Sequence, residues 1–160
     1  QSDTVKAWLA NNQYQAASEL LDRMNVLPYE GASEVHNLFV RTHLHLALNK
    51  MLEGDWTGAL KDLARSKEYP EQLGTGRPFD PDERLQDFLE AICLEHLGQK
   101  EEARNKYSNL IKYSKKYPEG PFACFGTLAR VKLGQKNQTE FLKAKSQLPL
   151  EFKAKLEKLL

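Results

Sequence analysis

Apolar residues recur at intervals of three and four along almost the whole chain, which is the spacing of an amphipathic helix. Gly, Pro and Asn separate these stretches, and the alternating β-branched runs that form strands are missing. The pattern therefore predicts an all-α protein. It places helices at about 3–11, 14–26, 33–53, 56–68, 81–97, 100–117, 120–133, 137–147 and 149–160.

One turn plan occurs four times. A helix-ending Gly or Asn is followed five residues later by a small residue and nine residues later by a large one. Gly suits the left-handed conformation that ends a helix, and a small residue lets two helices approach closely. The large residue lies one turn further on the same face and fills the space between the helices. The copies are Asn12, Ala17 and Leu21; Gly54, Ala59 and Leu63; Gly98, Ala103 and Tyr107; and Gly134, Thr139 and Lys143, which departs from the plan.

These turns resemble those of a known family. The segments GDWTGALKDLA (54–64) and LGQKEEARNKY (97–107), with Tyr-Pro at 69–70 and 117–118, resemble the turn between the two helices of a tetratricopeptide (TPR) repeat. The resemblance implies one domain, a right-handed superhelical array of about four helix-turn-helix repeats. They would span approximately 1–28, 33–70, 81–118 and 120–148, with a C-terminal capping helix at 149–160. The spacing of the turns exceeds the 34-residue TPR period, and the extra residues fall in the linkers 27–34 and 70–81.

Residues 67–98 are also similar to segments of large bacterial TPR-containing proteins of unknown function, in which the repeats follow β-rich domains. This similarity implies a repeat module taken from a longer chain. Flanking domains of the same parent chain would then be among its partners.

Charge and hydropathy narrow the class of partner. The chain has 23 Lys and Arg against 22 Asp and Glu, a balance that gives no bulk attraction to nucleic acid or to an anionic membrane. No apolar run approaches the ~20 residues of a membrane span. We expect a soluble protein that binds neither nucleic acid nor membrane, with a cytoplasmic location favoured over a periplasmic or extracellular one.

The segment 73–84, LGTGRPFDPDER, raises the question of a phosphate-binding loop. Its two glycines are followed by Arg77 and Pro78 rather than by Gly-Lys-Ser/Thr, and the acidic residues after them would repel a phosphate. The sequence instead predicts a turn and a helix start, with Asp80 as the N-cap and Glu83 three residues later in a capping box. Phe79 would then pack onto the first turn of the helix, and Arg77 is a candidate linker contact for a partner.

Candidate catalytic groups do not converge. His36, His43 and His45 lack the i,i+3 or i,i+4 spacing with which a helix binds metal. Cys93 and His96 have that spacing, but they lie in an apolar helical face, where a buried Cys is the commoner structural outcome. We therefore expect no cofactor, no metal and no enzymatic activity, and keep a thiol-dependent enzyme using Cys93 as a remote third hypothesis.

Surface recognition is the leading functional hypothesis: a scaffold that binds a protein or peptide on the concave face of the array. A structural or oligomerisation domain supporting an attached enzyme is the alternative. The carboxylate clamp of chaperone-binding TPR domains does not fit, because Leu44, Leu48 and Phe88 stand at its positions. The expected concave face is a polar stripe on helix 33–53 with its neighbours on the later first helices, namely Asn37, Arg41, His45, Asp87, Glu90, Thr127 and Arg130.

Overall fold

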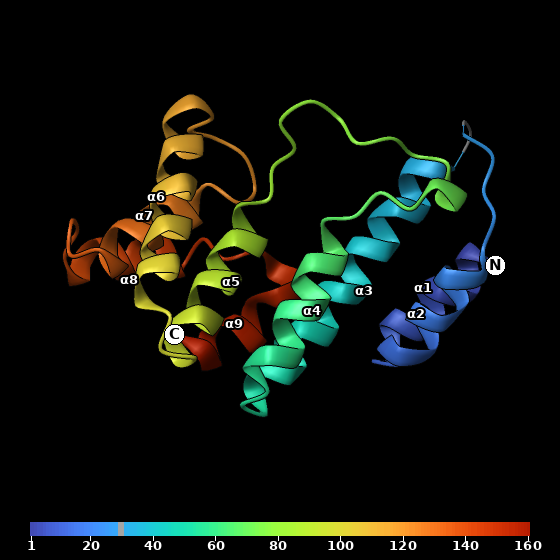
Figure 1. Ribbon diagram of the computed structural model, residues 1–160, viewed down its shortest axis with the longest axis horizontal. Coiled ribbons are helices and arrows are strands. Elements are labelled where there is room, and N and C mark those ends of the chain that lie inside the picture. Colours follow the sequence, from blue (N-terminus) through green and yellow to red (C-terminus); the bar gives the residue numbers. More distant parts are fainter. Residues whose placement is uncertain (29–30) are drawn as a thin grey trace.

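A computed structural model describes residues 1–28 and 31–160, and throughout these residues the chain is helical with no strand (Figure 1). The all-α prediction is confirmed. The nine helices are α1 (Ser2–Ala10), α2 (Tyr14–Arg23), α3 (Ala32–Leu52), α4 (Trp56–Ser66), α5 (Arg84–His96), α6 (Lys100–Lys116), α7 (Cys124–Lys132), α8 (Gln138–Lys145) and α9 (Lys153–Leu159). Two single-turn 3₁₀ helices, η1 (Glu71–Leu73) and η2 (Leu150–Phe152), complete them.

Consecutive helices from α1 to α8 pack against one another along the chain. The small residues of the first three turns are enclosed between helices, since Ala17, Ala59 and Ala103 are at most 1% exposed. The large residues that follow them, Leu21, Leu63 and Tyr107, are at most 2% exposed. The predicted packing of these three turns is confirmed. In the fourth copy Thr139 is exposed, and Ala144 is the buried residue of α8 instead.

The helix α3 joins two parts of the hydrophobic core. One part lies between α1, α2 and the first half of α3, and includes Val5, Leu21 and Phe39. The other begins at Leu44 and continues through all the later helices to α9. This explains why α3 is apolar on most of its surface: it is covered from both sides.

The C-terminal segment returns to the middle of the molecule. Figure 1 shows α9, in dark red, away from the outer end formed by α7 and α8, and α9 packs against α3. Phe152 and Leu156 belong to the larger core, at 4% and 0% exposure. The predicted helix at 149–160 is thus shorter, begins with a 3₁₀ turn, and contacts the second helical pair.

The predicted start of α5 is wrong. Asp80 is not the N-cap: it has a positive φ of 51°, and the helix begins at Arg84 with Glu83 at the N-cap position and no side-chain cap. Phe79 does not pack on the first turn either, because it is 91% exposed. The predicted helix at 120–133 likewise begins later, at Cys124.

A buried arginine accounts for both late starts. The Arg84 side chain is 2% exposed, and its guanidinium donates to both carboxylate oxygens of Asp82 at 3.0 and 2.8 Å. It also donates to the backbone carbonyls of Tyr117 and Glu119, both at 2.8 Å. Residues 80–83 and 117–120 are thereby held together as connecting segments rather than as helical turns.

Replacing Arg84 should be strongly destabilising, because its buried guanidinium joins two connecting segments. An Arg84→Met variant leaves two backbone carbonyls without their donor and leaves the Asp82 carboxylate with only the Arg84 backbone N–H. Loss of one partner of a fully buried ion pair costs about 3–5 kcal/mol, and Asp82 is 27% exposed, so we expect a loss near the lower end of that range. An Arg84→Lys variant should lose most of the same stability, because an ammonium cannot reach all these acceptors. Urea denaturation followed by circular dichroism measures both.

Arg104→Met is the matched control, since Arg104 is exposed on α6 and its removal should change stability by less than about 0.5 kcal/mol. A native-like unfolding midpoint for Arg84→Met would contradict the role assigned to this guanidinium.

Candidate functional site

Two of the predicted partner-binding residues hold the C-terminal segment. The Arg41 guanidinium donates from Nε to both carboxylate oxygens of Glu151, at 2.9 and 3.0 Å. His45 Nε2 lies 3.0 Å from Glu151 Oε1, so that its N–H donates to the same carboxylate. Residues more than 100 positions apart in the sequence therefore meet on the polar stripe of α3. We call this set, with Lys155 and Tyr14, the α3 site.

The hydrogen bonds of the α3 site form one chain. Because His45 donates from Nε2, its Nδ1 is an acceptor, and Lys155 Nζ donates to it at 3.0 Å. Lys155 also contacts the Tyr14 hydroxyl at 3.3 Å, and that hydroxyl donates to Asn12 Oδ1 at 2.7 Å. The chain links the turn between α1 and α2 with α3 and α9.

Aromatic contacts fix the geometry of these polar groups. The ring of His45 stacks on Tyr14 with centroids 4.5 Å apart and an interplanar angle of 7°, and it lies 4.7 Å from Phe152. The Lys155 ammonium sits 4.4 Å from the centroid of the Tyr14 ring, a cation–π arrangement. A hollow of about 640 Å³ opens beside this cluster, and the exposed Leu150 lines it.

Burial and charge act against each other in the α3 site. Burial alone raises the pKa of the Glu151 carboxyl, but the hydrogen bonds from His45 and Arg41, together with the Arg41 charge, outweigh it and hold that pKa below its ordinary value. Burial lowers the pKa of the Lys155 amine, and the Glu151 charge offsets this only in part. Burial also raises the pKa of the Tyr14 hydroxyl, which stays a proton donor.

The other predicted partner-binding residues lie elsewhere. Asp87 and Glu90 form a second cluster, in which both carboxylates contact the Lys67 ammonium and Glu90 Oε2 lies 3.5 Å from Lys106 Nζ. This cluster joins α5 to the end of α4 and to α6. The sequence analysis placed Asp87 and Glu90 on one face with Arg41 and His45, but in the structure these two pairs of residues belong to separate clusters.

Three further predicted residues have different surroundings. Asn37 is exposed and lines a hollow of about 210 Å³ that Gln86 and Phe122 also line. Thr127 and Arg130 are half-buried on α7, and neither belongs to the two clusters described above.

Arg77, the predicted linker contact for a partner, makes its contacts with residues of its own chain. Its guanidinium donates to Glu83 at 3.1 Å and lies 5.7 Å from the centroid of the Tyr69 ring.

The predicted histidines make separate contacts and do not come together. His36 contacts the Glu68 carbonyl and stacks on Tyr69, and His43 donates to Asp62 at 3.0 Å. Within residues 1–28 and 31–160, no group of three or more His, Cys, Asp or Glu side chains could hold a metal ion.

Cys93 is fully enclosed. Burial, with a further contribution from Glu90, raises the pKa of its thiol to about 12. His96, its expected base, instead stacks on Trp56 with ring centroids 3.8 Å apart. A thiol that stays protonated and enclosed is a poor nucleophile, so this geometry does not support the thiol-dependent enzyme.

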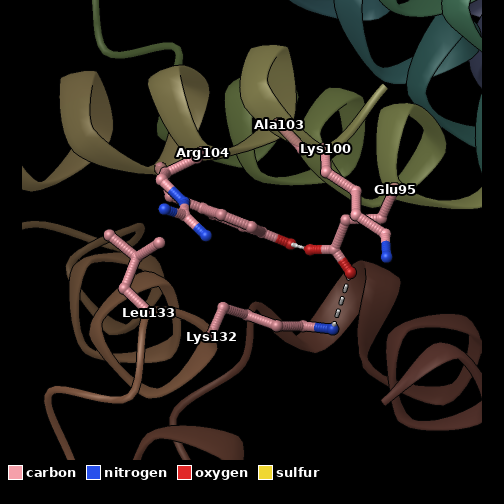
Figure 2. Close-up of a pocket in the computed structure, with 7 residues that line it drawn as sticks. Glu95, Lys100, Ala103, Arg104, Lys132 and Leu133 are labelled. Carbon is pink, nitrogen blue, oxygen red and sulfur yellow. Dashed lines mark hydrogen bonds and ion pairs between the residues drawn. The ribbon is translucent and has the colours of Figure 1, made fainter. Parts of the chain in front are cut away.

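A third polar site, absent from the sequence-based set, lies between α6 and the ends of α5 and α7. Figure 2 shows its lining, with Glu95 in the centre and the cationic side chains of Lys100, Arg104 and Lys132 around it. Tyr107 donates its hydroxyl hydrogen to Glu95, and Lys132 Nζ lies 3.6 Å from the other Glu95 oxygen. The cavity has a volume of about 310 Å³. We call it the basic groove.

No protein-family model matches the chain, and neither a curated protein nor a solved structure matches it significantly. Over residues 1–28 and 31–160 the fold is that of an all-α protein whose helices from α1 to α8 pack in the order of the sequence. In the part of the chain that the structure describes, no helix has both the length and the apolar character required to cross a bilayer.

The α3 site should weaken in acid. Glu151 has a lowered pKa in the folded protein, so the stability it contributes is complete above the ordinary carboxyl pKa of about 4.5 and is lost as the pH falls below it. Glu151→Gln should therefore be less stable than the native chain at pH 7, and the difference should shrink as the pH falls below about 4.5. Denaturation curves at pH 7 and pH 3 test this.

Glu157→Gln, on the exposed side of α9, is the matched control and should change stability little at either pH. A Glu151→Gln effect of equal size at both pH values would show that the carboxylate charge contributes nothing.

Proposed function

We propose that this protein is a protein-interaction module made of TPR-like helical hairpins, with no catalysis of its own. The buried Ala17, Ala59 and Ala103, each with its large partner one turn later, support the hairpin assignment. The left-handed glycines before them, such as Gly54 and Gly98 with φ of 81° and 78°, support it too. In such arrays the first helices of successive hairpins line a surface that binds extended or helical segments.

One observation carries the proposal: the polar stripe of α3 already binds a peptide segment, the chain's own residues 150–156. Recognition uses paired charges at Glu151 and Lys155, four residues apart, and apolar anchors at Phe152 and Leu156. This is the helix-in-groove mode, in which charges set the register and buried apolar side chains supply most of the affinity. The proposed ligand has the same pattern of acid, aromatic, lysine and leucine.

Binding in trans tests this proposal. A fluorescent peptide with the sequence of residues 149–160 is titrated into the 160-residue chain and into its Glu151→Lys variant, in which Arg41 repels the C-terminal segment. The variant should bind the peptide at least about tenfold more tightly than the native chain, since the competing intramolecular segment has a high effective concentration. A peptide with Lys in place of its glutamate at the Glu151 position should bind weakly.

Glu157→Lys is the matched control, because it makes the same charge change on the outer face of α9 and should leave peptide binding as in the native chain. Hydrogen exchange of the α9 amides reports whether the segment is released. Released α9 amides without peptide binding would refute the proposal.

A structural or oligomerisation role is the second candidate, and large exposed apolar side chains favour it. Phe79 is 91% exposed in the linker before α5, and Leu27 is 64% exposed in the linker after α2. Solvent-exposed aromatic residues of this kind are frequent in contacts between chains. Sedimentation equilibrium tests the role: it predicts a dimer that Phe79→Ser returns to monomer, whereas a native chain that stays monomeric at high concentration would exclude self-association.

A further inference from the structure

We propose that the basic groove is a second contact surface of the module and that it binds an acidic peptide segment of a partner protein. The groove lies between α6, which contributes Ala103 and Tyr107 to its lining, and the end of α7. Figure 2 shows Lys100, Ala103 and Arg104 on the α6 side and Lys132 and Leu133 opposite them. The groove shares no residue with the α3 site. The two proposals therefore rest on separate observations and can fail separately.

The charge balance of the groove favours an anion. Three cationic side chains, Lys100, Arg104 and Lys132, line it with a single carboxylate, Glu95. That carboxylate already has two partners, the Tyr107 hydroxyl and the Lys132 ammonium. Lys100 and Arg104 are exposed, and no ion pair of theirs occurs among the residues that the structure describes. An incoming carboxylate gains their charge without breaking an existing pair.

The shape of the groove favours a chain segment over a single small anion. A neighbouring hollow of about 400 Å³ shares Arg104, Lys132 and Leu133 with it and continues to Ser108 and Gln135. Lys100, Arg104 and Ser108 follow one another at four-residue intervals, so they form one line along α6. Alternate acidic side chains of an extended peptide lie on one side, about 6.6 Å apart, which is close to the separation of about 6 Å between residues four apart on a helix. They would contact this line, with Leu133 against the peptide backbone and aliphatic parts.

Glu95 limits the affinity of the groove. Its carboxylate neutralises one of the three cations and repels an incoming acid, while Tyr107 keeps it in place. Burial, with the hydrogen bond to Glu95, raises the Tyr107 pKa, so the hydroxyl keeps its proton and remains the donor. Glu95→Gln removes the charge and keeps an acceptor for the Tyr107 hydroxyl, so this variant should bind an acidic peptide more tightly. A misfolded variant would bind less tightly, so a gain in affinity cannot result from misfolding.

Fluorescence anisotropy with labelled hexaglutamate tests the proposal on the 160-residue chain. The native chain should bind hexaglutamate and not hexaglutamine, with an affinity that falls as ionic strength rises. Arg104→Glu should reduce the affinity by about tenfold or more, the size expected for loss of a charge-assisted contact. Glu95→Gln should raise it several-fold.

Lys61→Glu is the matched control, because Lys61 is exposed on α4, far from the groove in sequence and not among its lining residues, and it should leave the affinity unchanged. Equal binding by the native chain and Arg104→Glu, or no gain from Glu95→Gln, would overturn the proposal. Binding of inorganic phosphate or succinate at this site without binding of hexaglutamate would also overturn it, since the groove would then take small anions only.

Discussion

The close approach of paired helices at buried alanines is the constraint on which the other features of the structure depend. Ala17, Ala59 and Ala103 carry only a methyl group, so each pair of helices can pack closely, and the larger residue one turn later fills the remaining space. A longer side chain at these positions would separate the helices and misplace every contact between them. The hydroxyl of Tyr107 reaches Glu95 on α5 only because Ala103 brings α6 near that helix.

The close packing at the buried alanines also determines the contacts of one further position in each pair of helices. The residue three before each buried alanine, at the start of the second helix, extends toward the first helix of the next pair. Tyr14 stacks on His45 of α3, and Trp56 stacks on His96 of α5. Lys100, in the third copy, lines the basic groove with Lys132 of α7. A single repeated position thus builds an aromatic contact in two places and a charged cavity in the third.

The sequence predicted the helices well because their apolar period is local information, carried by residues three and four apart. It also identified Arg41 and His45 as a polar stripe on an otherwise apolar helix. It could not identify the occupant of that stripe, since Glu151 lies 110 residues from Arg41 and no local pattern connects them. The start of α5 was predicted wrongly for a related reason. Asp80 has the local features of an N-cap, but the Arg84 guanidinium binds Asp82 and the carbonyls of Tyr117 and Glu119, and no local pattern connects Arg84 with those distant residues.

The basic groove was missed although part of its signal is local. Lys100 and Arg104 stand four apart at the start of α6, where cations oppose the helix dipole and are not expected for stability. Such a pair indicates an anion-binding groove only when a third cation, here Lys132, lies close to it. Lys132 is on α7, so this proximity depends on how the helices pack and cannot be predicted from the local sequence.

The two proposed contact surfaces differ in whether their charged side chains already have partners within the chain. In the α3 site the His45 side chain is buried, whereas the Arg41 and Glu151 side chains are each 34% exposed, and the chain pairs these charges with one another. A ligand there has to reproduce the intramolecular contacts and displace a segment with two apolar anchors. In the basic groove, Lys100 and Arg104 are exposed and have no ion pair among the described residues, so water stabilises their charges and an incoming carboxylate has only to replace that water. The first surface therefore selects by shape and register, whereas the second selects by charge and responds to salt. A partner that carries a helix of the C-terminal pattern beside an acidic stretch would use both kinds of selection, and the linkage between them would raise its affinity above that of either segment alone.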